Sequence, residues 1–163
     1  MRRNCYIAAE ASAKDKLAAV AQLYPDAVFT GTAALAAYGL CEVRLPATIR
    51  VDNNCRARAD GLVRTVRSRP VPVNRVKGVK MALPAQAVAD ALSFERCGEW
   101  LLKEALAQAY RGLNGRGRFA ADLEMVSSKE KDAVRELAEL APVGTASKWE
   151  QRMFREMRRA GLN

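Results

Sequence analysis

The core of this chain is predicted around one segment, VFTGTAALAAYGL, which spans residues 28–40. Val28 and Phe29 are typical of a short strand, and a helix of small residues is expected over Thr30–Leu40, where Gly39 favours a stop. Four alanines in that helix would let a neighbouring element approach closely, so the helix is interpreted as a packing helix. The segment holds no nucleophile, general base or metal ligand.

Length and composition indicate one domain. The chain has 163 residues, of which 50% are hydrophobic and 6% aromatic. We expect a single domain over 1–163, with an N-terminal α/β lobe over about 1–82 and a C-terminal helical lobe over about 83–163. No run of 18 apolar residues occurs and the first ten residues make a poor signal peptide, so a cytoplasmic protein without a membrane partner is predicted.

The residue types present argue against an enzyme. The chain has 4 cysteines and no histidine. The absence of histidine excludes Ser-His-Asp and Cys-His catalysis as well as histidine metal sites, and the cysteines form no C-x-x-C pair. We therefore expect reduced thiols and no catalytic residues, bound metal or cofactor. A hidden carboxylate–lysine site is the remaining enzymatic alternative.

The predicted fold class is α+β, mainly helical. A helix from Ala11 to Leu23 is expected to begin with a capping box between Ser12 and Asp15. The region 45–81 is predicted to form a small antiparallel sheet, and helices are expected from 82 to 160. The sheet would contain strands at 47–51, 61–67 and 76–81, with Pro70 and Pro72 in an edge or connection, and a later helix over 95–111 would bury Trp100, Leu101, Leu106 and Tyr110.

Positive charge is concentrated in one part of the sequence. The net charge is +9, and residues 44–81 carry ten basic side chains, eight of them arginine, against Asp52 and Asp60. Arginine offers phosphate a planar, weakly hydrated fork, so this region is predicted to bind nucleic acid, with double-stranded DNA as the expected form. A surface for an acidic protein and a solvated sheet face are the alternatives. The predicted contacts are Arg56, Arg58, Arg64, Arg67, Arg69, Arg75, Lys77 and Lys80.

The C-terminal residues 147–160 are predicted to form an amphipathic helix. Trp149, Met153 and Met157 recur on one face of this helix. Its basic face is a further candidate nucleic-acid contact, and a packing helix with a solvated basic face is the alternative. The candidate contacts on it are Arg152, Arg155 and Arg159.

Three segments of the chain resemble AbiEi-type antitoxins of type IV toxin–antitoxin systems. The first is Thr30-Gly31 with its small-residue helix and Gly39-Leu40, which is similar to the family pattern L-T-G-x-S-A-A-x-x-x-G-L. The second is residues 78–92, which match a strand-to-helix pattern but carry Gln86 and Ala87 where arginine and threonine are usual. The third is residues 145–163. The matching positions in the last two segments are Gly78, Val79, Pro84, Val88, Asp90, Ser147, Glu150, Met153, Gly161 and Leu162.

The resemblance implies a non-catalytic regulator of bacterial or bacteriophage origin that acts in phage defence. Many such antitoxins repress transcription through an N-terminal winged helix-turn-helix, and longer members continue into a nuclease-like domain. The segments of this chain correspond to the core module, without either of those domains. We therefore expect an antitoxin-like, DNA-binding regulator. The alternative is an interaction module for an acidic protein such as a toxin, a regulator or a host factor.

Overall fold

The computed structural model describes residues 10–52, 60–67, 70–112, 114–126 and 129–141. The described chain combines helices with one five-stranded sheet, which confirms the α+β class. In chain order the elements are α1 (Ala13–Leu23), β1 (Val28–Phe29), α2 (Gly31–Ala37), β2 (Ala47–Val51), β3 (Val63–Arg67), β4 (Val73–Val76), β5 (Val79–Ala82), α3 (Pro84–Phe94), α4 (Glu99–Ala109), α5 (Gly115–Glu124) and α6 (Lys131–Glu139).

The sheet is mixed, so the expectation of an antiparallel sheet built from 45–81 was wrong. Its strand order is β3-β2-β1-β5-β4. The early strand β1 lies in the centre, antiparallel to β2 and parallel to β5. Strands β2 and β3 are parallel, in register from Ala47 against Val63 to Val51 against Arg67. Because β2 and β3 run in the same direction, the connection between them, residues 52–62, returns the chain to the same end of the sheet.

The end of the sheet forms a hairpin that was predicted as one strand. β4 and β5 pair antiparallel, from Val73 against Ala82 to Val76 against Val79. The turn between them is Lys77-Gly78, with φ values of 49° and 84°. Two consecutive residues with positive φ are typical of a type I′ turn, whose twist matches that of the flanking strands. β4 is an edge strand, which agrees with the prolines just before it.

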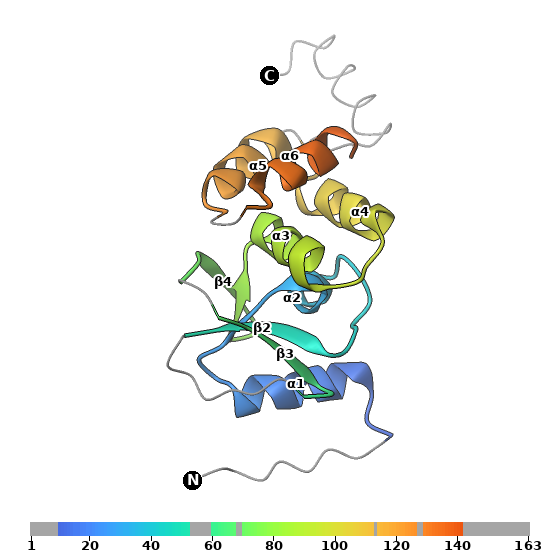
Figure 1. The fold of residues 1–163 in the computed structure, drawn as a ribbon, viewed down its shortest axis with the longest axis vertical. Coiled ribbons are helices and arrows are strands. Elements are labelled where there is room, and N and C mark those ends of the chain that lie inside the picture. The colour runs from blue at the N-terminus through green and yellow to red at the C-terminus, as the bar shows by residue number, and fades with distance from the viewer. Residues whose placement is uncertain (1–9, 53–59, 68–69, 113, 127–128, 142–163) are drawn as a thin grey trace, which may run out of the picture.

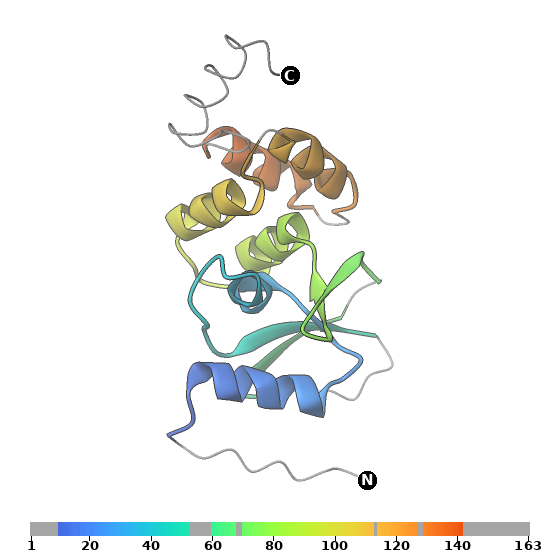
Figure 2. The ribbon, with the colours of Figure 1, turned by 180° about the vertical axis from the view of Figure 1, so that it is seen from behind.

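Helices cover both faces of the sheet. In Figure 1, α1 lies below the sheet, α2 and α3 lie above it, and α4, α5 and α6 stack beyond α3. Figure 2 shows the same layers from behind. The predicted capping box begins α1, since the Asp15 N–H donates to Ser12 Oγ over 3.2 Å and the Ser12 N–H donates to the Asp15 carboxylate over 3.3 Å. One continuous apolar core runs through the layers.

The packing role predicted for the alanine-rich helix is confirmed. Ala33, Ala34 and Leu35 of α2 are fully buried, and α2 packs against α3, whose own alanines are buried as well. Small side chains on both helices allow this close approach.

The C-terminal helices differ from the prediction in their buried face and their limits. Trp100 is 76% exposed, so placing it on a buried face was wrong, although Leu106 and Tyr110 are buried as expected. The helix begins at Glu99 rather than Glu95, and its buried residues are Leu102, Ala105 and Leu106. The predicted final helix at 147–160 lies outside the described residues. Among the described helices, none has the length and apolar character needed to cross a membrane.

Candidate nucleic-acid interface

The predicted basic contacts that the structure describes lie at two opposite edges of the sheet. Arg64 and Arg67 belong to β3 at one edge, whereas Arg75 and Lys80 flank the Lys77 turn in the hairpin at the other. The strand order therefore separates two groups of basic residues that were predicted to form one surface. The remaining predicted contacts, namely Arg56, Arg58, Arg69, Arg152, Arg155 and Arg159, lie outside the described residues.

Two of the three cations of the hairpin have partners within the protein. Arg75 donates from Nη1 to the Gly78 carbonyl over 3.1 Å, which closes the turn on itself. Lys80 Nζ lies 3.3 Å from Asp26 Oδ1, in an ion pair with an exposed carboxylate. These contacts hold two of the three basic groups of the hairpin close to the protein surface.

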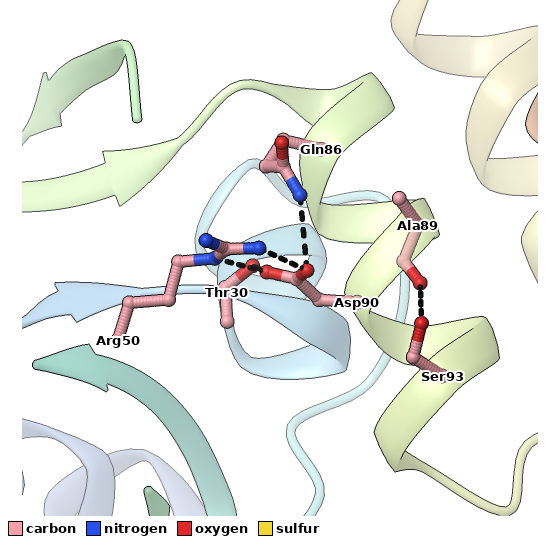
Figure 3. A network of polar contacts seen from close by, with 6 residues as sticks. All are labelled: Thr30, Arg50, Gln86, Ala89, Asp90 and Ser93. Carbon is pink, nitrogen blue, oxygen red and sulfur yellow. Dashed lines mark hydrogen bonds and ion pairs between the residues drawn. The ribbon is translucent and has the colours of Figure 1, made fainter. Parts of the chain in front are cut away.

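One arginine of the basic segment is buried and takes part in the core. Arg50 is 7% exposed and Asp90 is 1% exposed. Arg50 donates from Nε to Asp90 Oδ2 over 2.6 Å and from Nη2 to Oδ1 over 2.5 Å, so the pair is bidentate (Figure 3). The Thr30 hydroxyl also donates to Oδ2, and Gln86 Nε2 donates to Oδ1 over 3.0 Å.

This network joins the sheet to α3 and has a structural role. Helices cover both faces of β2, and all five of its residues are buried, so Arg50 is accommodated there because Asp90 faces it. Asp90 lies in the second half of α3, and both of its carboxylate oxygens accept hydrogen bonds from Arg50. Gln86, one of the two departures from the antitoxin pattern, belongs to the same network.

A second carboxylate closes the start of α2. Glu95 accepts the Thr32 N–H through Oε1 and Oε2, at 3.1 and 3.2 Å, and the Thr48 hydroxyl through Oε1, at 2.7 Å. It therefore caps a helix N-terminus from a distant part of the sequence. Gly31 makes this possible, because a Cβ at that position would lie 1.8 Å from Glu95 Oε1 and the residue has a φ of +59°.

Arginines gather around this capped helix start. A pocket of about 360 Å³ is lined by three arginines from three segments, together with a single acidic side chain, Glu95. Arg64 comes from β3 and donates from Nη1 to the carbonyl of Phe94, the last residue of α3. We call this site the arginine pocket. Its lining residues are Thr32, Arg44, Leu45, Pro46, Arg64, Phe94, Glu95, Arg96 and Cys97.

Only one of these three arginines was predicted from the sequence to be a contact. Arg64 was predicted, Arg44 was counted in the basic segment but not chosen, and Arg96 was missed because it follows α3 in a region of balanced charge. No local pattern connects Arg96 with the sheet. Arg96 lies near the sheet because α3, which precedes it in the chain, returns across β2. The buried ion pair between Arg50 and Asp90 holds α3 in that position.

The thiols near this pocket are poor nucleophiles. Burial raises the pKa of Cys41 to about 11, an effect that the nearby Arg44 opposes and the nearby Glu95 reinforces. Burial also raises the pKa of Cys97, and Glu95 adds to that shift. Both thiols therefore stay protonated at neutral pH. Within the described residues, no cluster of cysteine and carboxylate side chains could hold a metal ion.

Comparison of the chain with protein-family models, with curated proteins and with solved structures gave no match.

Proposed function

We propose that this protein is a non-catalytic, antitoxin-like regulator that binds double-stranded DNA through the arginine pocket. The observation that carries the proposal is that Arg44, Arg64 and Arg96 line one pocket. Its lining contains a single carboxylate, that of Glu95. Arg67, which is exposed on the same edge strand, extends this basic edge.

The state of each charged group favours a phosphate ligand. Arg44 and Arg96 are exposed, and neither forms an ion pair with another residue in the described part of the chain. Arg64 is oriented by the Phe94 carbonyl, which leaves further guanidinium donors for a ligand. Glu95 is engaged by the Thr32 N–H and the Thr48 hydroxyl. The pocket therefore has an excess of positive charge. That charge is carried by planar guanidinium groups, each of which can bind two phosphate oxygens at once.

The antitoxin-like role is supported by the three sequence segments alone. In this fold, two residues that match the family pattern have structural explanations: Gly31 admits Glu95 to the start of α2, and Asp90 neutralises Arg50. These two motif residues thus have structural roles, and the regulatory role stays a proposal. The same guanidinium groups could bind carboxylates of an acidic protein, which is therefore the alternative partner to DNA.

Binding can be measured by the fluorescence anisotropy of a labelled DNA duplex titrated with the full chain. We expect saturable binding at about 50 mM salt that weakens steeply by about 300 mM, because each neutralised phosphate releases counterions. The double variant Arg44→Ala/Arg96→Ala should lower the affinity and reduce the slope of log K against log salt by up to about 1.8, or 0.9 per lost phosphate contact.

The matched control removes two charges from the opposite edge of the sheet. Arg75→Ala/Lys77→Asn changes the net charge equally, so it should leave the salt slope close to that of the unmodified chain. Equal losses in the two variants would show that only overall charge matters and would contradict the arginine pocket as the contact. An unmodified chain that does not bind duplex at low salt, yet forms a nuclease-resistant complex with an acidic protein, would favour the competing partner.

A further inference from the structure

A second pocket lies at the other ends of α2 and α3. The arginine pocket contains Thr32, near the start of α2, and Phe94, at the end of α3, whereas this pocket contains Tyr38, just after α2, and Pro84, the first residue of α3. Its volume is about 570 Å³, within the range of small-molecule sites. We call it the tyrosine pocket, and its lining residues are Tyr38, Leu40, Asn74, Leu83, Pro84, Gln108, Ala109, Tyr110, Arg118, Ala121 and Asp122.

A buried tyrosine holds one carboxylate of this pocket in place. Tyr110 is 2% exposed, and its hydroxyl accepts the Ala85 N–H over 3.0 Å and donates to Asp122 Oδ2 over 2.7 Å. Burial, reinforced by the hydrogen bond to Asp122 and by its charge, raises the pKa of Tyr110, so the hydroxyl keeps its proton for this donation. Asp122 Oδ1 makes no hydrogen bond within the described residues and is available as an acceptor.

An arginine stands one helical turn from this carboxylate. Arg118 precedes Asp122 by four residues on α5, so the two side chains share a face of the helix. No ion pair joins them in the structure as described. Arg118 donates from Nη2 to the Arg111 carbonyl over 2.9 Å, which leaves other guanidinium donors for a ligand. The pocket thus offers a fixed acceptor and a separate cation.

The remaining walls favour a flat ring with donors on its edge. The Tyr38 and Pro84 side chains, together with the apolar side chains of Leu40 and Leu83, provide nonpolar walls on which such a ring can pack. Gln108 donates its amide to Glu104 over 2.8 Å, so its carbonyl oxygen is a second acceptor at the pocket. The two oxygens of a carboxylate lie side by side, and Asp122 Oδ2 keeps a lone pair beyond the one that accepts from Tyr110, so Asp122 suits a ligand edge with adjacent N–H groups. Arg118 offers its remaining donors to an anionic part of the same ligand.

We propose that the tyrosine pocket binds a guanine nucleotide, with Asp122 accepting the ring N1–H and the exocyclic amine and Arg118 contacting the phosphate. Guanine presents these two donors side by side, whereas adenine presents only its single exocyclic amine on the corresponding edge. This site is separate from the proposed DNA contact and does not depend on it.

Titration calorimetry on the full chain with GMP, AMP, guanosine and XMP tests the assignment. We expect GMP to bind at least about tenfold more tightly than AMP, because a mismatched base leaves a fixed acceptor unpaired. Asp122→Asn should lose GMP and gain XMP, since an amide donor suits the 2-oxo group of xanthine. Arg118→Ala should weaken GMP by about tenfold and leave guanosine nearly unchanged, because guanosine has no phosphate.

Gain of XMP binding by Asp122→Asn would also show that this variant is folded. Absence of GMP binding, equal binding of GMP and AMP, or unchanged GMP affinity in Asp122→Asn would each overturn the proposal. Binding of DNA by Asp122→Asn should equal that of the unmodified chain, so failure of this proposal is distinguishable from failure of the arginine pocket.

Discussion

At the scale of single residues, the fold depends on two carboxylates from α3 and the turn that follows it. Asp90 neutralises Arg50 inside the core, and Glu95 caps α2 through Thr32. Each contact joins residues at least forty positions apart in the sequence. Both act across the layer between the sheet and α3, so the start of α2 and the middle of β2 are fixed by the same helix and its end.

Gly31→Ala should destabilise the protein markedly. The residue has a left-handed φ of +59°, and an added Cβ would displace the Glu95 carboxylate. Backbone strain and loss of the cap together are expected to lower the free energy of unfolding by about 2–3 kcal/mol, measured by urea denaturation. Gly39→Ala is the matched control, because Gly39 has a φ of +75° but open space around it.

The control should show only the conformational cost, about 1 kcal/mol. If the two variants were equally destabilised, the close approach of Glu95 to Gly31 would have no energetic importance.

At the scale of elements, the sequence predicted those features that depend on local patterns. The capping box of α1 and the limits of β2 are as expected, and α3 lies in the region predicted to be helical. The direction of β3 and the central place of β1 were not predictable from the alternation of apolar and polar residues. That pattern shows which face of a strand is buried, but not which strands lie beside it. The same limit of sequence-based prediction applies to Arg50 near the candidate site. From the sequence alone, its side chain is expected to be a surface charge, and only the position of Asp90 shows that it is buried.

Lys77→Asn should stabilise the β4–β5 hairpin. Lys77 adopts a φ of 49° in a turn whose second residue is Gly78, and asparagine tolerates this conformation better than lysine does. We expect the free energy of unfolding to rise by about 0.5 kcal/mol in chemical denaturation, since asparagine followed by glycine is the preferred type I′ pair. Lys77→Val, which places a β-branched side chain at positive φ, should act in the opposite direction. A loss of stability in Lys77→Asn would contradict this account of the turn.

At the scale of the whole molecule, the buried hydroxyl of Tyr110 and the half-buried Tyr38 and Cys41 predict a loss of folding stability at alkaline pH. Burial raises the pKa of Cys41 from 9.0 to about 11 and raises the pKa values of Tyr38 and Tyr110 above 10.0. In the unfolded chain these groups lose their protons first, so the unfolded state is favoured as pH rises. The stability is therefore fully present below pH 9 and declines above it.

Urea unfolding near pH 8 and near pH 10.5 measures this decline, with Tyr110 contributing up to about 1.4 kcal/mol for each pH unit above its unfolded pKa. Tyr110→Phe is less stable at neutral pH because it loses two hydrogen bonds, but its stability should fall less between the two pH values. A free energy of unfolding that is constant over this range would show that these groups are as accessible in the native protein as in the unfolded chain.

The brevity of β1 has a mechanical consequence. This strand has two residues, and only Phe29 pairs with β5, through Met81, so the β3–β2 half of the sheet and the β5–β4 hairpin are joined by few backbone hydrogen bonds. Under an applied force, these two parts of the sheet can therefore slide past each other along β1. The bidentate contact between Arg50 and Asp90, with the Thr30 hydroxyl beside it, stabilises this boundary just beyond the end of β1.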